Sequence, residues 1–170
     1  MARSTAAPTA EWRADEAAWT AAALAQWRHQ RSLVETAREH LHRGDTLTIS
    51  WAGATTTLTG PIVGVGSDVL ALSVARTRVD VALGAHVPIV WRVVRRAPDG
   101  GSRGHAFDSL RARLLELEAR GDAVDVGVAD EIVRGELTVC RDHVAVTDDS
   151  GSCTVLAFSA LRYLKVPSTH

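Results

Sequence analysis

Short segments in which apolar and polar residues alternate occupy two stretches of the chain, residues 46–93 and 124–166. In the second stretch, for example, Val124, Val126 and Val128 are separated by single polar or small residues. A period of two is typical of strands that bury one face. Because the segments are short and lie between turn sequences, we expect about five strands in each stretch, folded into a strongly bent antiparallel sheet. The expected core positions are Leu47, Ile49, Trp51, Leu58, Ile62, Leu70, Leu72, Val79, Val81, Leu83, Val90 and Val93, then Val124, Val126, Val128, Val133, Leu137, Val139, Val144, Val146, Val155, Leu161, Leu164 and Val166.

An apolar stripe with helical spacing precedes the second stretch. Asp108 stands where it can cap the start of this helix, and Gly121 can take the left-handed conformation just after its end. A helix with one apolar stripe must pack on something, and the following sheet is the expected partner. The members of the stripe are Phe107, Leu110, Leu114 and Leu117.

A longer helical pattern precedes the first stretch and predicts one helix of roughly 33 residues over 11–43, about 50 Å long. Its last turns correspond to the helix before the second stretch. The remainder carries Trp12, Trp19 and Trp27, which recur near a seven-residue period. Two interpretations stay open: the tryptophans dock on the protein's own sheets, or they contact a partner protein or a second copy of the chain.

The two stretches and the helices before them repeat each other in order. The sequence Arg-Gly-Asp at residues 43–45 returns at 120–122, and Ser-Leu at 32–33 returns at 109–110, both shifted by 77 positions. The strand segments that follow match at shifts of 74 and 73. The common order of these matches favours a tandem duplication.

Composition narrows the class of protein. With 46% hydrophobic and 23% charged residues, the chain has the composition of a globular protein. Its net charge of −1 gives no overall attraction to nucleic acid or to an anionic membrane. We find no apolar stretch long enough to span a bilayer and no signal peptide, so we expect a cytoplasmic protein.

Residues that could support catalysis or metal binding are not grouped in a productive pattern. His40 and His42 lie two positions apart in a helical segment, so their side chains point in different directions. Neither Cys140 nor Cys153 has the spacing of a zinc site, and we expect both to pack in the core, although the sequence does not say whether they pair. We therefore expect no enzyme activity, no metal and no cofactor.

Positive charge gathers where the first stretch ends and in the segment after it. A cluster of arginines without interleaved aromatic residues is a weak signal for nucleic-acid binding. The second stretch has an excess of acidic residues, which would repel a phosphate backbone. The candidate nucleic-acid residues are Arg92, Arg95, Arg96 and Arg103.

The segment from Gly135 to Val146 resembles the first motif of Sm-like small β-barrels, and the segment from Gly60 to Leu72 resembles it more loosely. The whole layout resembles an uncharacterised bacterial family with an N-terminal helix and two tandem Sm-like small β-barrels, some members of which are labelled transcriptional regulators. The Sm-like resemblance implies uridine-rich RNA binding on a ring, through an Asn in the first motif and an Arg-Gly or Lys-Gly step in the second. This chain has Leu70-Ala71 and Val144-Ala145 where the Asn would stand, so those binding residues are not carried over.

The sequence thus predicts a mainly β protein with helices, built from a tandem pair of Sm-like five-stranded small barrels. The expected parts are a tail (1–10), a long helix (11–43), a first barrel (44–96), a linker (97–106), and a helix with a second barrel (107–167). The expected function is that of a non-enzymatic binding or adaptor protein, contacting a protein partner or forming a homodimer through Trp12, Trp19 and Trp27. The alternative is a nucleic-acid-binding regulator that uses the first barrel.

Overall fold

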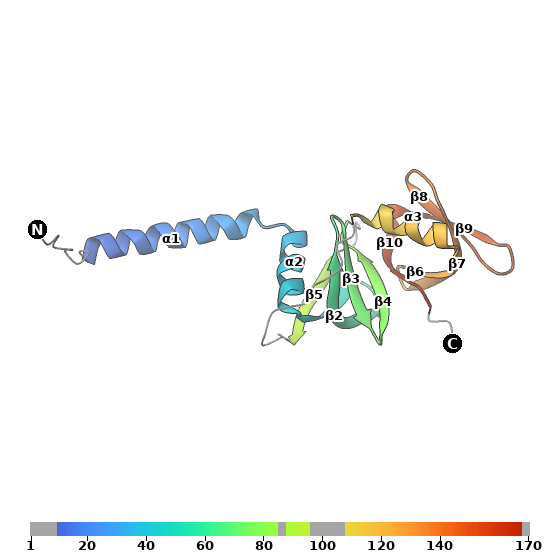
Figure 1. Cartoon of the computed structure of the whole chain (residues 1–170), viewed down its shortest axis with the longest axis horizontal. Helices are drawn as coiled ribbons and strands as arrows, with labels where there is room; N and C mark the ends of the chain where they lie inside the picture. The colour runs from blue at the N-terminus through green and yellow to red at the C-terminus, as the bar shows by residue number, and fades with distance from the viewer. Residues whose placement is uncertain (1–9, 85–87, 96–107, 168–170) are drawn as a thin grey trace, which may run out of the picture. The chain divides into compact units, whose positions relative to one another are not determined.

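The N-terminal helix and the β-rich remainder of the chain form separate units. The computed structural model describes residues 10–84, 88–95 and 108–167 (Figure 1). The chain forms two compact units, residues 1–32 and residues 33–170. The first contains helix α1 (Ala10–Gln30), and the second contains all ten strands and the remaining helices.

The predicted single helix over 11–43 is wrong, because α1 ends at Gln30 and a second helix, α2 (Leu33–Arg43), begins three residues later. Ser32 stands directly before α2. Its counterpart Ser109 stands before α3 (Leu110–Arg120) and accepts a hydrogen bond from the backbone N–H of Ala112. Serine favours such a capping position over the interior of a helix. Alanine supplies eight of the 21 residues of α1, and its high helix propensity favours a helix there without a core beneath it.

Ten strands form one mainly antiparallel sheet, which confirms the expectation of a mainly β protein with helices. Its order is β5-β1-β2-β3-β4-β10-β6-β7-β8-β9. The first five strands are β1 (Thr46–Trp51), β2 (Thr57–Val65), β3 (Val69–Val74), β4 (Thr77–Ala82) and β5 (Ile89–Arg95). The others are β6 (Val124–Val128), β7 (Glu131–Val139), β8 (His143–Thr147), β9 (Cys153–Ala157) and β10 (Leu161–Lys165), with the short 3₁₀ helix η1 (Phe158–Ala160) before β10. The sheet is open at β5 and at β9, so two closed barrels are not confirmed.

Both halves of the sheet have the same internal order, with the last strand beside the first. They also share a point of close backbone approach. A Cβ on Gly60 of β2 would lie 2.2 Å from the carbonyl oxygen of Ser73, and a Cβ on Gly135 of β7 would lie 2.1 Å from that of Thr147. Only glycine fits such a close approach. The matched glycines therefore mark the same bend in each half.

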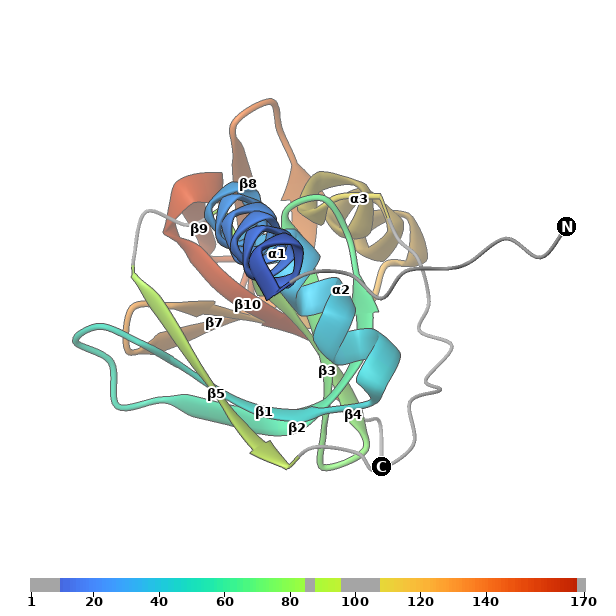
Figure 2. The ribbon, with the colours of Figure 1, turned by 90° about the vertical axis from the view of Figure 1, so that its left-hand side faces the viewer.

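The two halves join where β4 pairs with β10, in a register that places Tyr163 opposite Val81. Figure 2 views the first half with the strands of the second behind it. Each half has its own core, and each core takes residues from the other half: Tyr163 packs in the first, with its ring 5.8 Å from that of Trp51, and Val69 and Ala82 pack in the second. The halves are thus joined by packing as well as by strand pairing.

Most of the predicted core positions are buried or partly buried, but two are wrong. Val90 of β5 is 56% exposed and Val155 of β9 is 63% exposed. Both lie on the outer face of their strands, since Ile89 and Trp91 of β5 pack against the first core and Leu156 of β9 is buried in the second. The cap prediction at Asp108 is also wrong, since Ser109 takes that position, whereas the left-handed conformation of Gly121 is confirmed (φ 65°).

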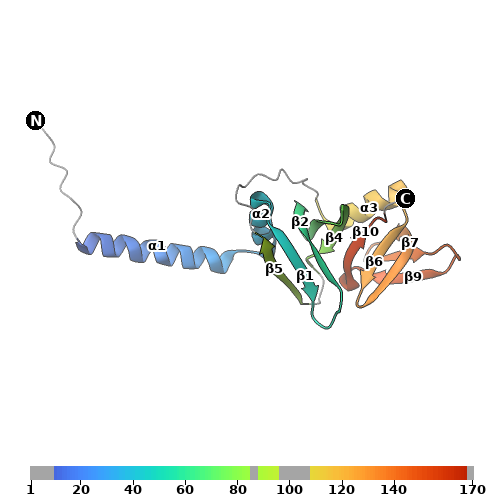
Figure 3. The ribbon, with the colours of Figure 1, turned by 90° about the horizontal axis from the view of Figure 1, so that it is seen from below.

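Each of the two shorter helices packs on its own half of the sheet. Helix α2 lies against β2 and β3, and α3 lies against β7 (Figure 3). The buried residues of α3 include Leu110, Leu114 and Leu117, as its predicted apolar stripe requires. Phe107, the fourth predicted member of the stripe, lies outside the described residues.

Candidate partner-binding surfaces

Three tryptophans of α1, which we call the tryptophan face, are exposed to solvent. Trp12 is 55%, Trp19 78% and Trp27 53% exposed. At 100° per residue, their positions fall within about 80° around the helix axis. Three indoles on one side of a helix give the kind of exposed apolar surface that marks a contact site.

The end of the tryptophan face carries a positive charge. The guanidinium of Arg31 lies 4.4 Å from the centroid of the Trp27 ring, within the range of a cation–π interaction. Arg28 lies in the last turn of the helix. The C-terminal end of α1 is therefore basic as well as aromatic.

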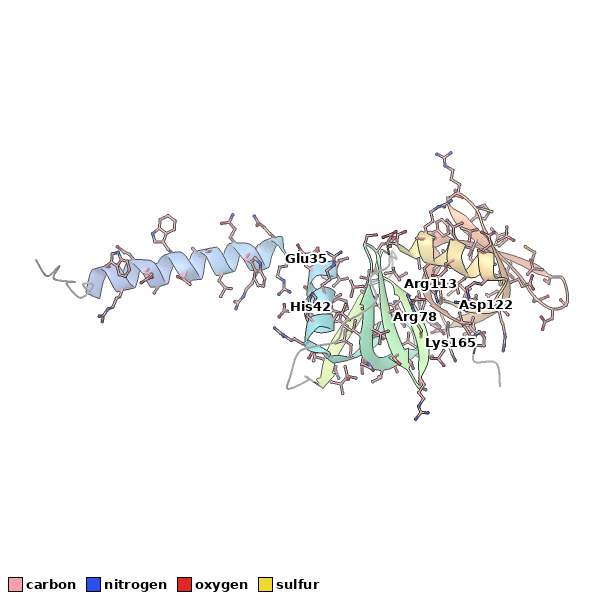
Figure 4. The ribbon with its side chains drawn as sticks, in the orientation of Figure 1. Glu35, His42, Arg78, Arg113, Asp122 and Lys165 are labelled. Atoms are coloured by element: carbon pink, nitrogen blue, oxygen red, sulfur yellow. The ribbon has the colours of Figure 1, made fainter. Side chains whose placement is uncertain are left out.

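A buried ion cluster joins the two halves of the sheet. Asp80 of β4 accepts hydrogen bonds from Nε of Arg78 at 2.7 Å and from Nε of Arg113 at 2.8 Å. Arg113 belongs to α3 and also pairs with Glu116 at 2.6 Å. Asp80 and Arg113 are both buried. Figure 4 labels Arg78 and Arg113, which reach the junction from β4 and from α3.

The protonation of this cluster follows from its geometry. Burial opposes the charge on Arg113, but the hydrogen bonds and charges of Glu116 and Asp80 outweigh burial and raise its pKa. The hydrogen bond from Arg113 lowers the pKa of Glu116. Both shifts favour the ionised forms of Arg113 and Glu116, and the charged Arg113 in turn pairs with Asp80 of β4.

A second carboxylate of the first half holds the start of α3. Oδ1 of Asp68, in the turn between β2 and β3, accepts the backbone N–H of Leu110 at 2.7 Å. The backbone N–H of Ser67 donates to the carbonyl oxygen of Asp108 at 2.9 Å. A carboxylate at a helix N-terminus satisfies a free donor and opposes the positive end of the helix dipole. This contact joins residues 42 positions apart, so no local sequence pattern indicates it.

The ion cluster is not repeated in the second half. Asp80 lies opposite Ala71 in the sheet, and its counterpart Val155 lies opposite Ala145. The shift of 77 places Thr36 where Arg113 stands in α3. The two halves therefore differ at the position where they meet.

The lowered pKa of Glu116 predicts an acid dependence of stability. A group with a lowered pKa in the folded state stabilises the fold above its unfolded pKa, and that contribution is lost as the pH falls through the folded pKa. We expect Glu116→Gln to reduce the loss of stability between about pH 6 and pH 3. The measurement is urea denaturation across this range, with Glu136→Gln on the exposed side of β7 as the control. Identical pH profiles for Glu116→Gln and the original protein would refute the assignment.

Two of the described histidines, His40 and His143, form local pairs with aspartates. Nδ1 of His40 lies 2.7 Å from Oδ2 of the buried Asp45, and its ring meets Trp91 edge-on at 6.2 Å. Nδ1 of His143 lies 2.7 Å from Oδ1 of Asp142, and this hydrogen bond lowers the pKa of Asp142. Among the described residues, no group of three or more His, Cys, Asp or Glu side chains could hold a metal ion.

The structure brings together only part of the predicted arginine cluster. Arg92 is exposed on β5, where it lies opposite Thr48 of β1, and Arg95 ends the same strand. Arg96 and Arg103 lie outside the described residues. The two described arginines of the cluster, Arg92 and Arg95, thus lie on one edge strand, β5.

Both cysteines are free thiols. Cys140 is partly buried, and Cys153 is exposed on β9. The prediction that Cys153 packs in the core is wrong, because Cys153 lies on the same outer face of β9 as the exposed Val155.

One surface hollow of about 580 Å³ lies beside the turn between β8 and β9. One of its two acidic residues, Asp148, accepts hydrogen bonds from Ser150 and from the backbone N–H of Ser152. These bonds, the one from the Ser150 hydroxyl first, lower the pKa of Asp148. The carboxylate is therefore used to hold its own turn.

Comparisons with known proteins complete the description. No described helix of this chain is both long enough and apolar enough to cross a membrane. No protein-family model matches the chain, and no curated protein matches it.

Proposed function

We propose that the protein is a non-enzymatic adaptor that acts through protein–protein contacts made by the tryptophan face of α1. The observation that carries the proposal is the exposure of Trp19, at 78%, between two further exposed tryptophans on the same side of the helix. Tryptophan is enriched among the residues that dominate binding energy at protein interfaces. The two-half sheet serves as the scaffold to which this helix is tethered.

The internal contacts of the remaining unit support its role as a scaffold. Its two cores share residues across the junction, and the buried pair of Asp80 and Arg113 links β4 to α3. Asp68, Asp80 and Arg113 each make hydrogen bonds that hold α3 against the first half. Residues with such roles contribute to folding, which leaves the contact function to α1.

We also propose that each half is a Sm-like module opened at one edge. The support is the order of helix and five strands in each half, together with the matched glycines Gly60 and Gly135. In this view the first module donates β4 to the junction and the second donates β10. The two fused modules make the scaffold rigid. The proposal does not include the recognition of RNA bases by these modules.

Replacing the tryptophan face should abolish partner contact without unfolding the sheet. We expect the triple variant Trp12→Ala, Trp19→Ala and Trp27→Ala to raise the dissociation constant of the contact at least about 30-fold. This lower bound corresponds to the loss of a single interface residue that contributes about 2 kcal/mol. The thermal midpoint of residues 33–167 should be unchanged, because α1 belongs to a separate unit. The measurement is the amount of partner protein that the tagged full-length protein captures. Thermal denaturation of the same samples then gives the thermal midpoint.

The matched control is Ile132→Ala, which removes a side chain that is 61% exposed on β7. Equal capture by the triple variant and the original protein would refute the adaptor proposal. A nuclease-sensitive mobility shift at low salt, lost in Arg92→Ala, would instead favour the nucleic-acid-binding regulator.

A further inference from the structure

We propose that α1 pairs with α1 of a second copy of the chain, in antiparallel orientation, through the tryptophan face. This inference rests on the adaptor function proposed above and names the partner of the same surface. The tryptophan positions, the charges of the helix and the other residues on the same side each support it.

The three tryptophans are placed almost symmetrically along α1. At 1.5 Å per residue, Trp19 lies about 10 Å from Trp12 and about 12 Å from Trp27 along the helix axis. In an antiparallel pair centred between residues 19 and 20, Trp12 of each copy lies level with Trp27 of the other. The two Trp19 side chains then meet near the centre. All six indoles are buried together in this arrangement.

The charges of α1 distinguish antiparallel from parallel pairing. Asp15 and Glu16 give its N-terminal half a net negative charge over residues 12–16, whereas Arg28 and Arg31 make residues 27–31 positive. A parallel pair would place like charges beside each other, at a cost. An antiparallel pair centred between residues 19 and 20 instead places residues 12–16 of each copy level with the uncharged residues 23–27 of the other, and it also opposes the two helix dipoles.

The space between the tryptophans suits a close helix pair. Glu16 and Ala23 fall on the same side of α1 as the tryptophans, at 100° per residue. Residue 16 of one copy lies level with residue 23 of the other, since both are equally far from the centre. The small Ala23 leaves room for the longer Glu16 of the partner. Contact between residue 16 of one copy and residue 23 of the other therefore distinguishes antiparallel from parallel pairing of the two helices.

Sedimentation of the full-length protein over a range of concentrations tests the pairing. We expect a monomer–dimer equilibrium, with Trp19→Ala raising the dissociation constant at least about 30-fold. Val155→Ala, which trims an exposed side chain on the free edge strand β9, should leave the dissociation constant unchanged. A full-length protein that stays monomeric would overturn the inference, as would a dimer that Trp19→Ala does not weaken.

Disulfide trapping tests the orientation in full-length protein that carries Cys140→Ser and Cys153→Ser. A disulfide needs Cα atoms no more than about 7 Å apart. In the antiparallel pair two residues at position 16 are about 10 Å apart along the axis, but residue 16 lies level with residue 23 of the partner. We therefore expect a mixture of Glu16→Cys and Ala23→Cys proteins to cross-link, and each protein alone to remain largely uncross-linked.

The outcomes separate this inference from the proposal on which it rests. Cross-linking of Glu16→Cys with itself would indicate a parallel pair and would overturn the inference. A monomer that captures a different protein through the tryptophan face would also overturn it, while leaving the adaptor function standing. If the original protein neither self-associates nor captures another protein, both the inference and the adaptor proposal are refuted.

Discussion

Asp80→Val is expected to lower the free energy of unfolding by about 3–5 kcal/mol, among the largest effects of any single substitution in this protein. The change removes the buried carboxylate that accepts a hydrogen bond from Arg113. Arg113 then stays buried with Glu116 as its remaining acidic partner in the cluster. Valine is suitable for the test because Val155 occupies the matching position of the second half, so the strand itself accommodates it.

The double variant Asp80→Val/Arg113→Leu separates the buried charge from the shape of the junction. Replacing both members of a buried ion pair with apolar residues is often close to neutral. We expect the double variant to recover most of the stability that the single variant loses, as measured by urea denaturation. A double variant as unstable as the sum of the two single variants would show that the ion pair is not the source of the effect.

Gly60→Ala and Gly135→Ala are each expected to lower the free energy of unfolding by about 3 kcal/mol, the upper range for overpacking. In both cases the added Cβ would lie little more than 2 Å from a backbone carbonyl oxygen, that of Ser73 or that of Thr147. Neighbouring strands would have to separate to admit it. Because the two glycines stand at matching positions, the two losses should be similar.

Gly84→Ala is the matched control for the two glycine variants. A Cβ at Gly84 meets nothing within 4 Å. Urea denaturation should therefore show little change for Gly84→Ala beside the large losses at Gly60 and Gly135. A neutral effect at either Gly60 or Gly135 would contradict the equivalence of the two halves.

Sequence periodicity predicted the strands because burial alternates along them. Leu47, Ile49 and Trp51 are buried in β1 as the period of two requires. The repeated Arg-Gly-Asp also placed a helix end correctly, since Gly121 takes the left-handed conformation that glycine adopts readily. Such features depend on neighbours within a few residues, which a single sequence displays.

Other features depend on contacts between distant residues. Nothing local distinguishes Arg113 from Arg111 or Arg120, yet Arg113 alone of these three is buried against Asp80. The pairing of β4 with β10 likewise joins strands more than 70 residues apart. The break between α1 and α2 was open to prediction, because Ser-Leu precedes both α2 and α3.

Helical spacing alone was enough to place the three tryptophans on one side of a helix. The period of Trp12, Trp19 and Trp27 indicated one side of a helix, and all three are exposed. Of the four arginines in the candidate nucleic-acid cluster, only Arg92 and Arg95 lie among the described residues. A sequence can place side chains on one face of a helix, but it does not say what covers them.

Hydrogen–deuterium exchange of the full-length protein at low and high concentration tests the central claim most directly, that contact is made by α1 and not by the sheet. The account predicts that raising the concentration slows exchange across residues 12–30 and leaves the edge strands β5 and β9 unchanged. Slower exchange in β5 or β9, with residues 12–30 unaffected by concentration, would contradict it.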